Sequence, residues 1–271
     1  MSPSNDNERR VAWITGASRG IGADTALRLA ARGYDVALTA RDQSRLDALA
    51  AEIDALGTRA LAFSADLTDR AAMGAFADAA LEWGGRCDVL CNIGVYQGAD
   101  VWQSFVETPI DEIARSLEGD VVAPALLCQR AIPSMVANGG GVIVNMSSAV
   151  VFLTPGDVEG SGWSLAYAAS KAGIDQFAKS INAELGAAGV RAYTVEPGHT
   201  AYGDQFRALV GGASGAPVNP AEAIGAAIVW LVESPEAERL LAKRIHLPAI
   251  AQKQSLLEGW DGPGSAYPTR W

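Results

Sequence analysis

The sequence has few of the residues that build metal centres and disulfide frameworks. Its 271 residues include three cysteines and only two histidines, His199 and His246. Cys87, Cys91 and Cys128 form no Cys-x-x-Cys pair and have no histidine near them in the sequence. We therefore expect reduced thiols and no metal site. The scarcity of histidine also argues against a conventional Ser-His-Asp triad.

Basic runs and long apolar segments are missing as well. The formal net charge is −10, whereas a nucleic-acid binder should carry a basic face, so we expect no nucleic-acid partner. No stretch approaches the roughly 18 consecutive apolar residues of a membrane span. The polar segment from Met1 to Arg10 lacks the apolar core of a secretory signal. The expectation is a cytoplasmic protein that acts on a small molecule and has no membrane partner.

Short apolar, β-branched runs alternate with helical stretches from residue 11 to about residue 247. The predicted strands are 11–15, 35–39, 59–63, 88–91, 141–146, 190–196 and 243–247, and the longest predicted helices are 109–136 and 166–187. Such alternation predicts an α/β fold in a single domain. The expected core is a doubly wound, mostly seven-stranded parallel Rossmann sheet with helices on both faces.

The domain boundaries follow from the same pattern. We predict a polar extension at residues 1–8, a dinucleotide-binding catalytic domain at 9–250 and a C-terminal tail at 251–271. Two segments rich in glycine, proline or serine interrupt the alternation, at 149–165 and 198–217. Loops that follow strand ends often line or cover a site, so we expect these two to be substrate loops.

A glycine-rich turn, Thr15-Gly-Ala-Ser-Arg-Gly-Ile-Gly22, follows the first predicted strand and opens the first helix. Glycines let the backbone turn tightly and approach a pyrophosphate, and a helix N-terminus offers free N–H groups to it. This position in the fold favours dinucleotide binding over the alternative of a tight turn without a ligand. The cofactor-binding residues predicted here are Gly16, Ser18, Arg19, Gly20, Ile21 and Gly22.

The end of the second predicted strand indicates the type of dinucleotide. An acidic residue there would bind the ribose hydroxyl of NAD, but this chain has Ala40 followed by Arg41. Arg41 and Arg19 together suit a ribose phosphate, which favours NADP(H) over NAD(H). Asp42 lies close by, so NAD(H) binding stays an alternative. Arg41 could also be a solvent-exposed residue at the start of the helix, with no role in cofactor binding.

Tyr167 and Lys171 lie four residues apart in Tyr-Ala-Ala-Ser-Lys and therefore share one face of a helix. A phenol normally titrates near pH ~10, and an adjacent ammonium favours the phenolate. The pair could exchange a proton with an alcohol or carbonyl oxygen. The alternative is a surface aromatic residue beside a lysine that extends to solvent.

With these motifs in order, the chain resembles the short-chain dehydrogenase/reductase family over about residues 9–247. Beyond the glycine turn and the Tyr-Lys pair, Gly141 to Ser148 looks like that family's fifth strand ending in its serine, and Pro197-Gly198 like the turn beside the nicotinamide. The resemblance implies further cofactor contacts at Asp66, Leu67, Asn92, Gly94, Tyr167, Lys171, Pro197, Gly198 and Thr200.

The resemblance also implies catalytic roles. Tyr167 is the general acid for carbonyl reduction and the base for alcohol oxidation. Lys171 binds the nicotinamide ribose and lowers the tyrosine pKa, and Ser148 holds the substrate oxygen, with Ser147 as the neighbouring alternative. Asp120 stands where the family has an asparagine that joins a proton relay, which places a carboxylate near Lys171.

Three other departures from the family pattern matter. Cys91 replaces the first asparagine of Asn-Asn-Ala-Gly, which removes a polar contact in the sheet. The segment between Ser148 and Tyr167 is longer than usual, which predicts a reshaped substrate pocket or a longer surface loop. The last strand ends His246-Leu-Pro instead of Asp-Gly-Gly, which leaves dimer and tetramer open for the expected homo-oligomer.

The predicted function is NAD(P)(H)-dependent oxidoreduction of a carbonyl or secondary alcohol. An aromatic lining would suit a bulky or aromatic substrate; its candidates are Tyr96, Trp102, Phe152, Trp163, His199 and Tyr202. Each of these could equally belong to the core or surface. The alternatives are a catalytically silent nucleotide-binding regulator and an epimerase or dehydratase on the same scaffold.

Overall fold

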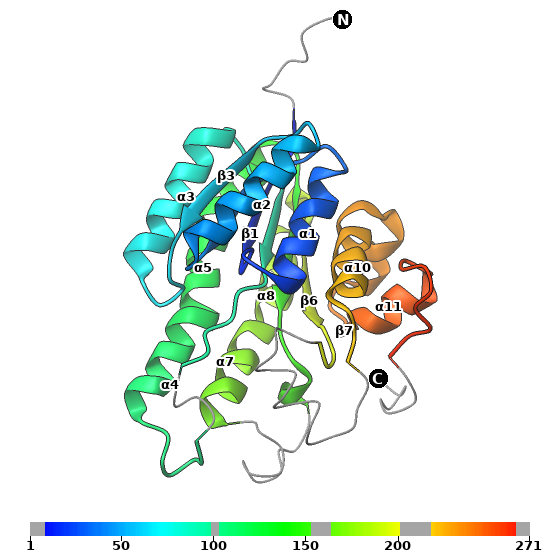
Figure 1. Cartoon of the computed structure of the whole chain (residues 1–271). Helices are drawn as coiled ribbons and strands as arrows, with labels where there is room; N and C mark the ends of the chain where they lie inside the picture. The colour runs from blue at the N-terminus through cyan, green and yellow to red at the C-terminus, as the bar shows by residue number, and fades with distance from the viewer. Residues whose placement is uncertain (1–8, 99–102, 153–163, 201–217, 264–271) are drawn as a thin grey trace, which may run out of the picture.

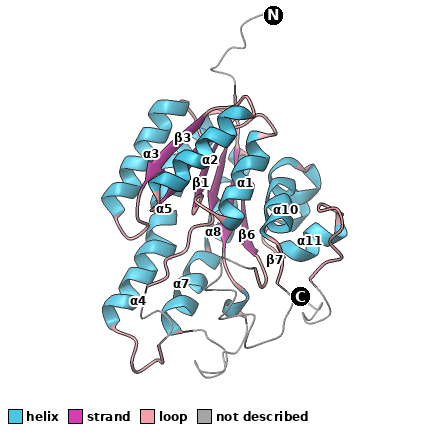
Figure 2. Ribbon diagram, viewed as in Figure 1, coloured by secondary structure: helices cyan, strands magenta, loops and turns pink. Residues whose placement is uncertain are grey.

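The computed structural model describes residues 9–98, 103–152, 164–200 and 218–263. They form one seven-stranded sheet whose order is β3-β2-β1-β4-β5-β6-β7, with every neighbouring pair parallel. The strands are β1 Val11–Thr15, β2 Asp35–Ala40, β3 Ala60–Ser64, β4 Val89–Asn92, β5 Gly141–Met146, β6 Val190–Glu196 and β7 Ile245–His246. The predicted doubly wound Rossmann sheet is confirmed (Figure 2).

Helices cover both faces of the sheet (Figure 1). One layer consists of α1 Gly20–Ala30, α2 Gln43–Ala55, α10 Ala221–Glu233 and α11 Leu247–Lys253, and the other of α3 Arg70–Gly84, α5 Ala123–Ala137 and α8 Phe177–Leu185. Side chains of β1 alternate between them: Ala12 and Ile14 pack in the first core, Val11 and Trp13 in the second. This two-sided burial explains why the strands read as continuous apolar runs.

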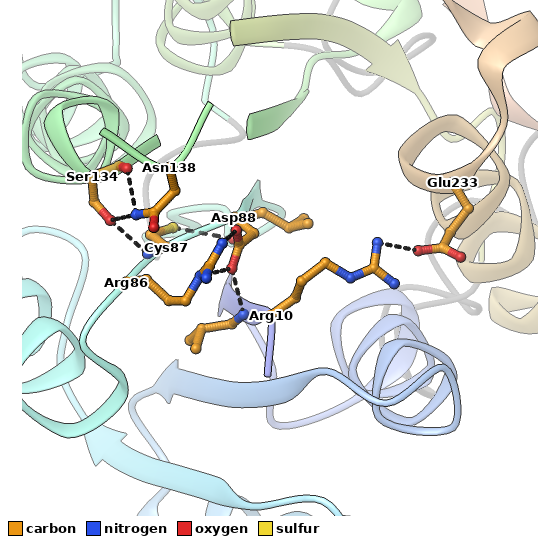
Figure 3. A network of polar contacts seen from close by, with 9 residues as sticks. Arg10, Arg86, Cys87, Asp88, Ser134, Asn138 and Glu233 are labelled. Carbon is orange, nitrogen blue, oxygen red and sulfur yellow. Dashed lines mark hydrogen bonds and ion pairs between the residues drawn. The ribbon is translucent and has the colours of Figure 1, made fainter. Parts of the chain in front are cut away.

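Acidic side chains secure the amino-terminal edge of the sheet, away from the strand ends that bear the candidate site. Asp88 accepts a hydrogen bond from the Val11 backbone N–H at 2.8 Å and is paired with Arg86 at 2.6 Å (Figure 3). Asp35 does the same for the backbone N–H of Arg59 at 2.9 Å and also binds its guanidinium. These carboxylates satisfy N–H groups that the parallel ladder leaves free at the start of each strand.

Additional helical segments extend past the carboxyl ends of the strands. The predicted helix 109–136 is α4 Ile110–Leu117, a π-helical turn Glu118–Val122 and α5, and the predicted helix 166–187 is α7 Leu165–Asp175, α8 and a short 3-10 turn Gly186–Ala188. Figure 1 shows α4 and α7 close together beyond the sheet, and they pack against each other.

The end of the chain differs from the prediction. The expected last strand at 243–247 has only two residues, because Leu247 begins α11 and Pro248 occupies its first turn, a position that suits proline. α11 also crosses the predicted boundary at residue 250 and packs on α10. None of the helices in the described ranges is both long and apolar enough to cross a membrane.

Candidate active site

A glycine cradle lies where β1 and β4 end. A Cβ atom on Gly16 would stand 2.7 Å from the Gly94 Cα, and one on Gly22 would stand 2.3 Å from the Gly16 carbonyl oxygen. Gly16 also has a φ of +68°, which favours glycine. The three glycines therefore let two strand ends and one helix start meet closely, as a pyrophosphate-binding turn requires.

The cradle opens into a cavity of about 570 Å³ at the switch point of the sheet. Nine of the predicted cofactor residues line it, namely Gly16, Ser18, Arg19, Ile21, Gly22, Arg41, Asp66, Leu67 and Gly94. Further lining residues that the sequence analysis did not assign to the cofactor are Thr39, Ala40, Asp42, Arg45, Ala65, Ile93, Val95, Tyr96 and Gln97. A cavity of this size, bounded by glycines and a helix start, fits the adenine and pyrophosphate half of a dinucleotide.

The N-terminus of α1 faces this cavity without a capping side chain. Arg19 is the N-cap residue in extended conformation, with no hydrogen bond from its side chain to the first turn, and that turn holds no acidic residue. In contrast, Asp42 caps α2 and Asp69 caps α3 through their carboxylates. The first backbone N–H groups of α1 are thus available to phosphate oxygens.

Arginines gather at the far end of the cavity. Arg41 lies 4.0 Å from the Asp66 carboxylate, and Arg45 lies 3.2 Å from that of Asp42. Both guanidiniums are more than half exposed, so an incoming anion can draw them away from these weak surface pairs. Arg45 was missed from the sequence: it lies in the first turn of α2, whereas Arg41 precedes the Asp42 cap of that helix.

Hydrogen bonds hold the strand ends in place behind the cradle. The Thr15 hydroxyl accepts from the backbone N–H groups of Ile93 and Gly94, at 3.1 and 2.9 Å. Asn92 does not line the cavity: it is buried and donates to the Asn145 side chain at 2.8 Å, linking β4 to β5. Cys91 is a fully buried core residue with a pKa raised to about 12 by burial.

Ser148, Tyr167 and Lys171 come together beyond β5 and on α7. Ser148 caps the 3-10 turn Ala149–Val151, and its side chain also forms a hydrogen bond with Tyr167. The Lys171 Nζ lies 5.7 Å from the centroid of the Tyr167 ring and donates to the Met146 carbonyl at 3.3 Å. Ser147 points elsewhere, because its hydroxyl donates to the Lys171 backbone carbonyl at 3.2 Å.

The Asp120 carboxylate joins α7 to the cavity. It lies in the π-helical turn between α4 and α5, and such turns occur often at functional sites. One oxygen accepts from the Ser170 hydroxyl at 2.7 Å and lies 3.8 Å from Lys171 Nζ, and the other accepts from the Tyr96 backbone N–H at 2.7 Å. Asp120 and Lys171 are both almost completely buried. The side chain therefore connects the lysine to a residue that lines the cavity.

The electrostatics of Tyr167 differ from the expectation. Burial raises the pKa of its phenol, and the negative charges of Asp120 and Glu196 raise it further, while the hydrogen bond with Ser148 acts in the opposite direction. The pKa of Tyr167 in the protein without cofactor is therefore raised, whereas the resemblance implied that Lys171 lowers it. Burial is the largest of these effects and disfavours the charged phenolate, so the pKa of Tyr167 lies above its ordinary value and the phenol stays protonated at neutral pH.

The turn after β6 contains the remaining predicted cofactor residues. Gly198 has a φ of +62°, and the Thr200 hydroxyl donates to the Pro197 carbonyl at 2.8 Å. Neither they nor Pro197 line the cavity described above. Of the proposed aromatic pocket, Tyr96 lines that cavity, whereas Trp102, Trp163 and Tyr202 lie outside the described residues.

Comparisons with known proteins agree with this arrangement. The sequence profile described as short chain dehydrogenase matches residues 10–208. The chain is 32% identical to an L-rhamnose 1-dehydrogenase (NAD(P)(+)) of a Sphingomonas species over 70% of its length and 72% of the relative's. It is 34% identical to a cyclohexanol dehydrogenase of a Rhodococcus species over 72% of its length and 75% of the relative's.

A solved structure shares both sequence and fold with the chain. It is a metagenomic short-chain oxidoreductase in complex with NADP, 34% identical, with a TM-score of 0.65 over 82% of this chain and 90% of that one. The profile match, the sequence identities and the shared fold all indicate one family. The chain belongs to the short-chain dehydrogenase/reductase family of oxidoreductases.

Proposed function

We propose that this protein transfers a hydride between NADP(H) and a bulky or aromatic carbonyl compound or secondary alcohol. The observation that carries the proposal is the meeting of Ser148, Tyr167 and Lys171 next to the dinucleotide cavity. Tyr167 and Ser148 share a hydrogen bond, and Lys171 is tied through Asp120 to Tyr96 on the cavity wall. A substrate carbonyl oxygen placed between the two hydroxyls would accept a hydrogen bond from Ser148 and would receive a proton from Tyr167.

The residues of the chain supply position and proton transfer. The nicotinamide supplies the hydride acceptor or donor when it is bound. In carbonyl reduction the Ser148 hydroxyl donates to the substrate oxygen, and the Tyr167 phenol delivers the proton to that oxygen. In alcohol oxidation the phenolate of Tyr167 removes the hydroxyl proton. Lys171 would bind the ribose hydroxyls and stabilise the phenolate.

The preference for NADP(H) is supported by the three arginines on the cavity wall, Arg19, Arg41 and Arg45. Ala40 ends β2, so no carboxylate occupies the strand end that binds a ribose hydroxyl in NAD enzymes. Asp42 is capping α2, where its carboxylate accepts from the Arg45 backbone N–H at 3.2 Å. Guanidinium groups bind phosphate through two parallel hydrogen bonds, so they favour the phosphorylated ribose.

Tyr167→Phe tests the proposed chemistry. We expect turnover to fall by at least about a hundredfold, the contribution of a positioned general acid, with NADPH affinity unchanged. The assay is NADPH absorbance with a panel of cyclic and aryl ketones. If no ketone in the panel causes the wild type to oxidise NADPH, the result would favour the catalytically silent regulator. A wild type that converts substrate with no net change in NADPH would favour an epimerase or dehydratase.

Arg41→Ala and Arg45→Ala test the cofactor preference. Each variant should weaken NADPH binding by about tenfold, a typical loss for one charge-assisted hydrogen bond, and leave NADH binding nearly unchanged. Arg239→Ala is the matched control, since Arg239 pairs with Glu236 at the same i,i+3 spacing and distance of 3.2 Å, far from the cavity. Equal losses for NADPH and NADH, or none, would reject the preference.

Two further expectations remain part of the proposal. A homodimer or homotetramer is the assembly we propose from the family membership, to be measured by light scattering. The cytoplasmic location is supported by the three cysteines, which are all buried and free of disulfides. Localisation of the tagged full-length chain by fractionation tests it.

A further inference from the structure

A buried charge cluster lies at the ends of β6 and β7, and the only role described for it above is the effect of the Glu196 charge on the pKa of Tyr167. Arg244 lies 3.0 Å from the Glu196 carboxylate, and the His246 Nε2 lies 3.8 Å from the same oxygen. The exposed fractions of these side chains are 15% for Arg244, 2% for Glu196 and 9% for His246. Removing charges from water in this way is unfavourable unless they are paired, so each of Arg244 and Glu196 compensates the burial of the other.

The cluster is packed against the turn that follows β6. A Cβ atom on Gly198 would stand 3.1 Å from the Pro248 Cγ and 3.2 Å from the His246 Nε2, so the turn and the cluster leave no room between them. The residues that replace the family's Asp-Gly-Gly ending therefore form a rigid support beside the candidate active site.

Arg244 supports one particular side chain of the substrate region. Its Cζ lies 4.1 Å from the centroid of the Phe152 ring, in cation–π contact. Phe152 is 48% exposed, so much of the ring remains open to solvent. The cation–π contact holds one face of the ring, and the solvent-exposed remainder is open to contact with an apolar group.

Phe152 is also close to the catalytic groups along the chain. It ends the 3-10 turn Ala149–Val151 that Ser148 caps, and its N–H donates to the Ala149 carbonyl at 3.0 Å. That turn packs against α7, the helix that bears Tyr167. The 3-10 turn Ala149–Val151 therefore joins Phe152 directly to Ser148, whose hydroxyl would hold the substrate oxygen.

We propose that Arg244, held by Glu196, is a positioning residue that fixes Phe152 as an aromatic wall of the substrate site. The wall selects substrates that carry a planar ring near the reacting carbonyl or alcohol, and this inference rests on the proposed oxidoreductase function. A site for anionic substrates does not fit, because Arg244 is already neutralised by Glu196 and is mostly buried.

Binding measurements test this directly. Calorimetry with the Tyr167→Phe protein saturated with NADPH would compare benzylacetone with methyl octyl ketone, which has the same carbon count and methyl ketone group but no ring. Into that background we introduce Phe152→Leu, Arg244→Lys and both together. Lysine keeps the charge opposite Glu196 but lacks the planar group that stacks on the ring.

Each single substitution should weaken benzylacetone binding by about fivefold, the value of one aromatic contact. The double variant should lose no more than Phe152→Leu alone, because Arg244 acts through the ring. Methyl octyl ketone should change by less than twofold. Arg10→Lys is the matched control, since Arg10 stacks on Tyr34 at the same 4.1 Å, away from the candidate site, and it should leave both affinities unchanged.

Several outcomes would overturn the inference: losses that add in the double variant, equal losses for both ketones, no loss in Arg244→Lys, or no detectable binding of benzylacetone. If Arg244→Lys does not fold, the Glu196→Gln/Arg244→Met pair, which removes both charges, takes its place with the same expectations. Because binding needs no turnover, this result is independent of whether Tyr167→Phe abolishes catalysis.

Discussion

Replacing Asp120 by asparagine isolates the effect of one buried negative charge on the catalytic tyrosine. Asparagine keeps the shape of the side chain and can still accept the Tyr96 backbone N–H through its oxygen. It removes the charge that lies 3.8 Å from Lys171 Nζ. The carboxylate raises the pKa of Tyr167 and also neutralises the lysine that would lower it, so both effects of the substitution lower that pKa.

The size of the shift follows from Coulomb's law. Two unit charges about 4 Å apart interact by roughly 4 kcal/mol at an effective dielectric constant of about 20. Tyr167 is partly exposed and solvent weakens the interaction, so we expect about a third of that energy to reach its phenol. One pKa unit corresponds to about 1.4 kcal/mol. We therefore expect Asp120→Asn to lower the apparent pKa of Tyr167 by about one unit.

The assay is the pH dependence of kcat/KM in both directions. Alcohol oxidation needs the phenolate, so its rate rises with pH through the tyrosine pKa. In Asp120→Asn this rise should occur about one unit lower. Carbonyl reduction needs the phenol, so its fall at alkaline pH should move to lower pH by the same amount. Glu196, whose charge also raises the pKa of Tyr167, is left in place.

Ser170→Ala is the control for this experiment. It removes the hydroxyl that donates to Asp120 at 2.7 Å without changing the charge. It should shift the profile much less than Asp120→Asn and in the opposite direction, since a carboxylate that loses a donor concentrates its charge on Lys171. An unchanged or raised pKa in Asp120→Asn, with the cofactor still bound, would refute the electrostatic reasoning.

Three other substitutions test the scaffold. Burial and Arg244 lower the pKa of His246 from 6.5 to about 4, so on acidification the unfolded chain is protonated at this residue before the folded protein is. The free energy of unfolding should therefore decrease as the pH falls from 6.5 to 4. The decrease should be about 2 kcal/mol larger in the wild type than in His246→Gln, which cannot titrate. Gly22→Ala should weaken NADPH binding and destabilise the fold by roughly 2 kcal/mol, since its Cβ would overlap the Gly16 carbonyl. Asp35→Asn should lower the free energy of unfolding, measured by urea titration, by about 2 kcal/mol, because Asp35 binds the Arg59 backbone N–H and guanidinium. Asp47→Asn on the surface is the control and should change it by almost nothing. Equal effects of the two substitutions would contradict the role assigned to Asp35 at the strand edge.

The glycine turn shows how much of the site could be read from the sequence. Its residues act through their own backbone: Gly16 needs a positive φ, and Gly22 must lie against the Gly16 carbonyl six residues earlier. Such requirements involve residues that are close in the sequence, so the sequence alone predicts them. Arg45 is only four residues past Arg41, yet its place on the cavity wall depends on how α2 packs beside β3.

The active site behind Tyr167 shows the opposite case. The sequence places a lysine next to the tyrosine and suggests a lowered pKa, whereas the structure gives a raised one. The raised pKa comes first from burial of the phenol and then from the charges of Asp120 and Glu196, which are 47 and 29 residues away in the chain. Burial and the charges of residues distant in the sequence both depend on the folded structure, so the spacing of residues along the chain does not predict them.

The sequence by itself determined the alternating fold, the phosphate-binding turn and the Tyr167–Lys171 pair, because hydrophobic period, glycine conformation and i,i+4 spacing are all properties of neighbouring residues. Tertiary structure decided which charges surround that pair, that Asn92 faces Asn145, and that Arg244 crosses the end of β6 to reach Phe152. These contacts join segments that only the crossovers of the sheet bring together, and their energies depend on burial that the fold alone creates.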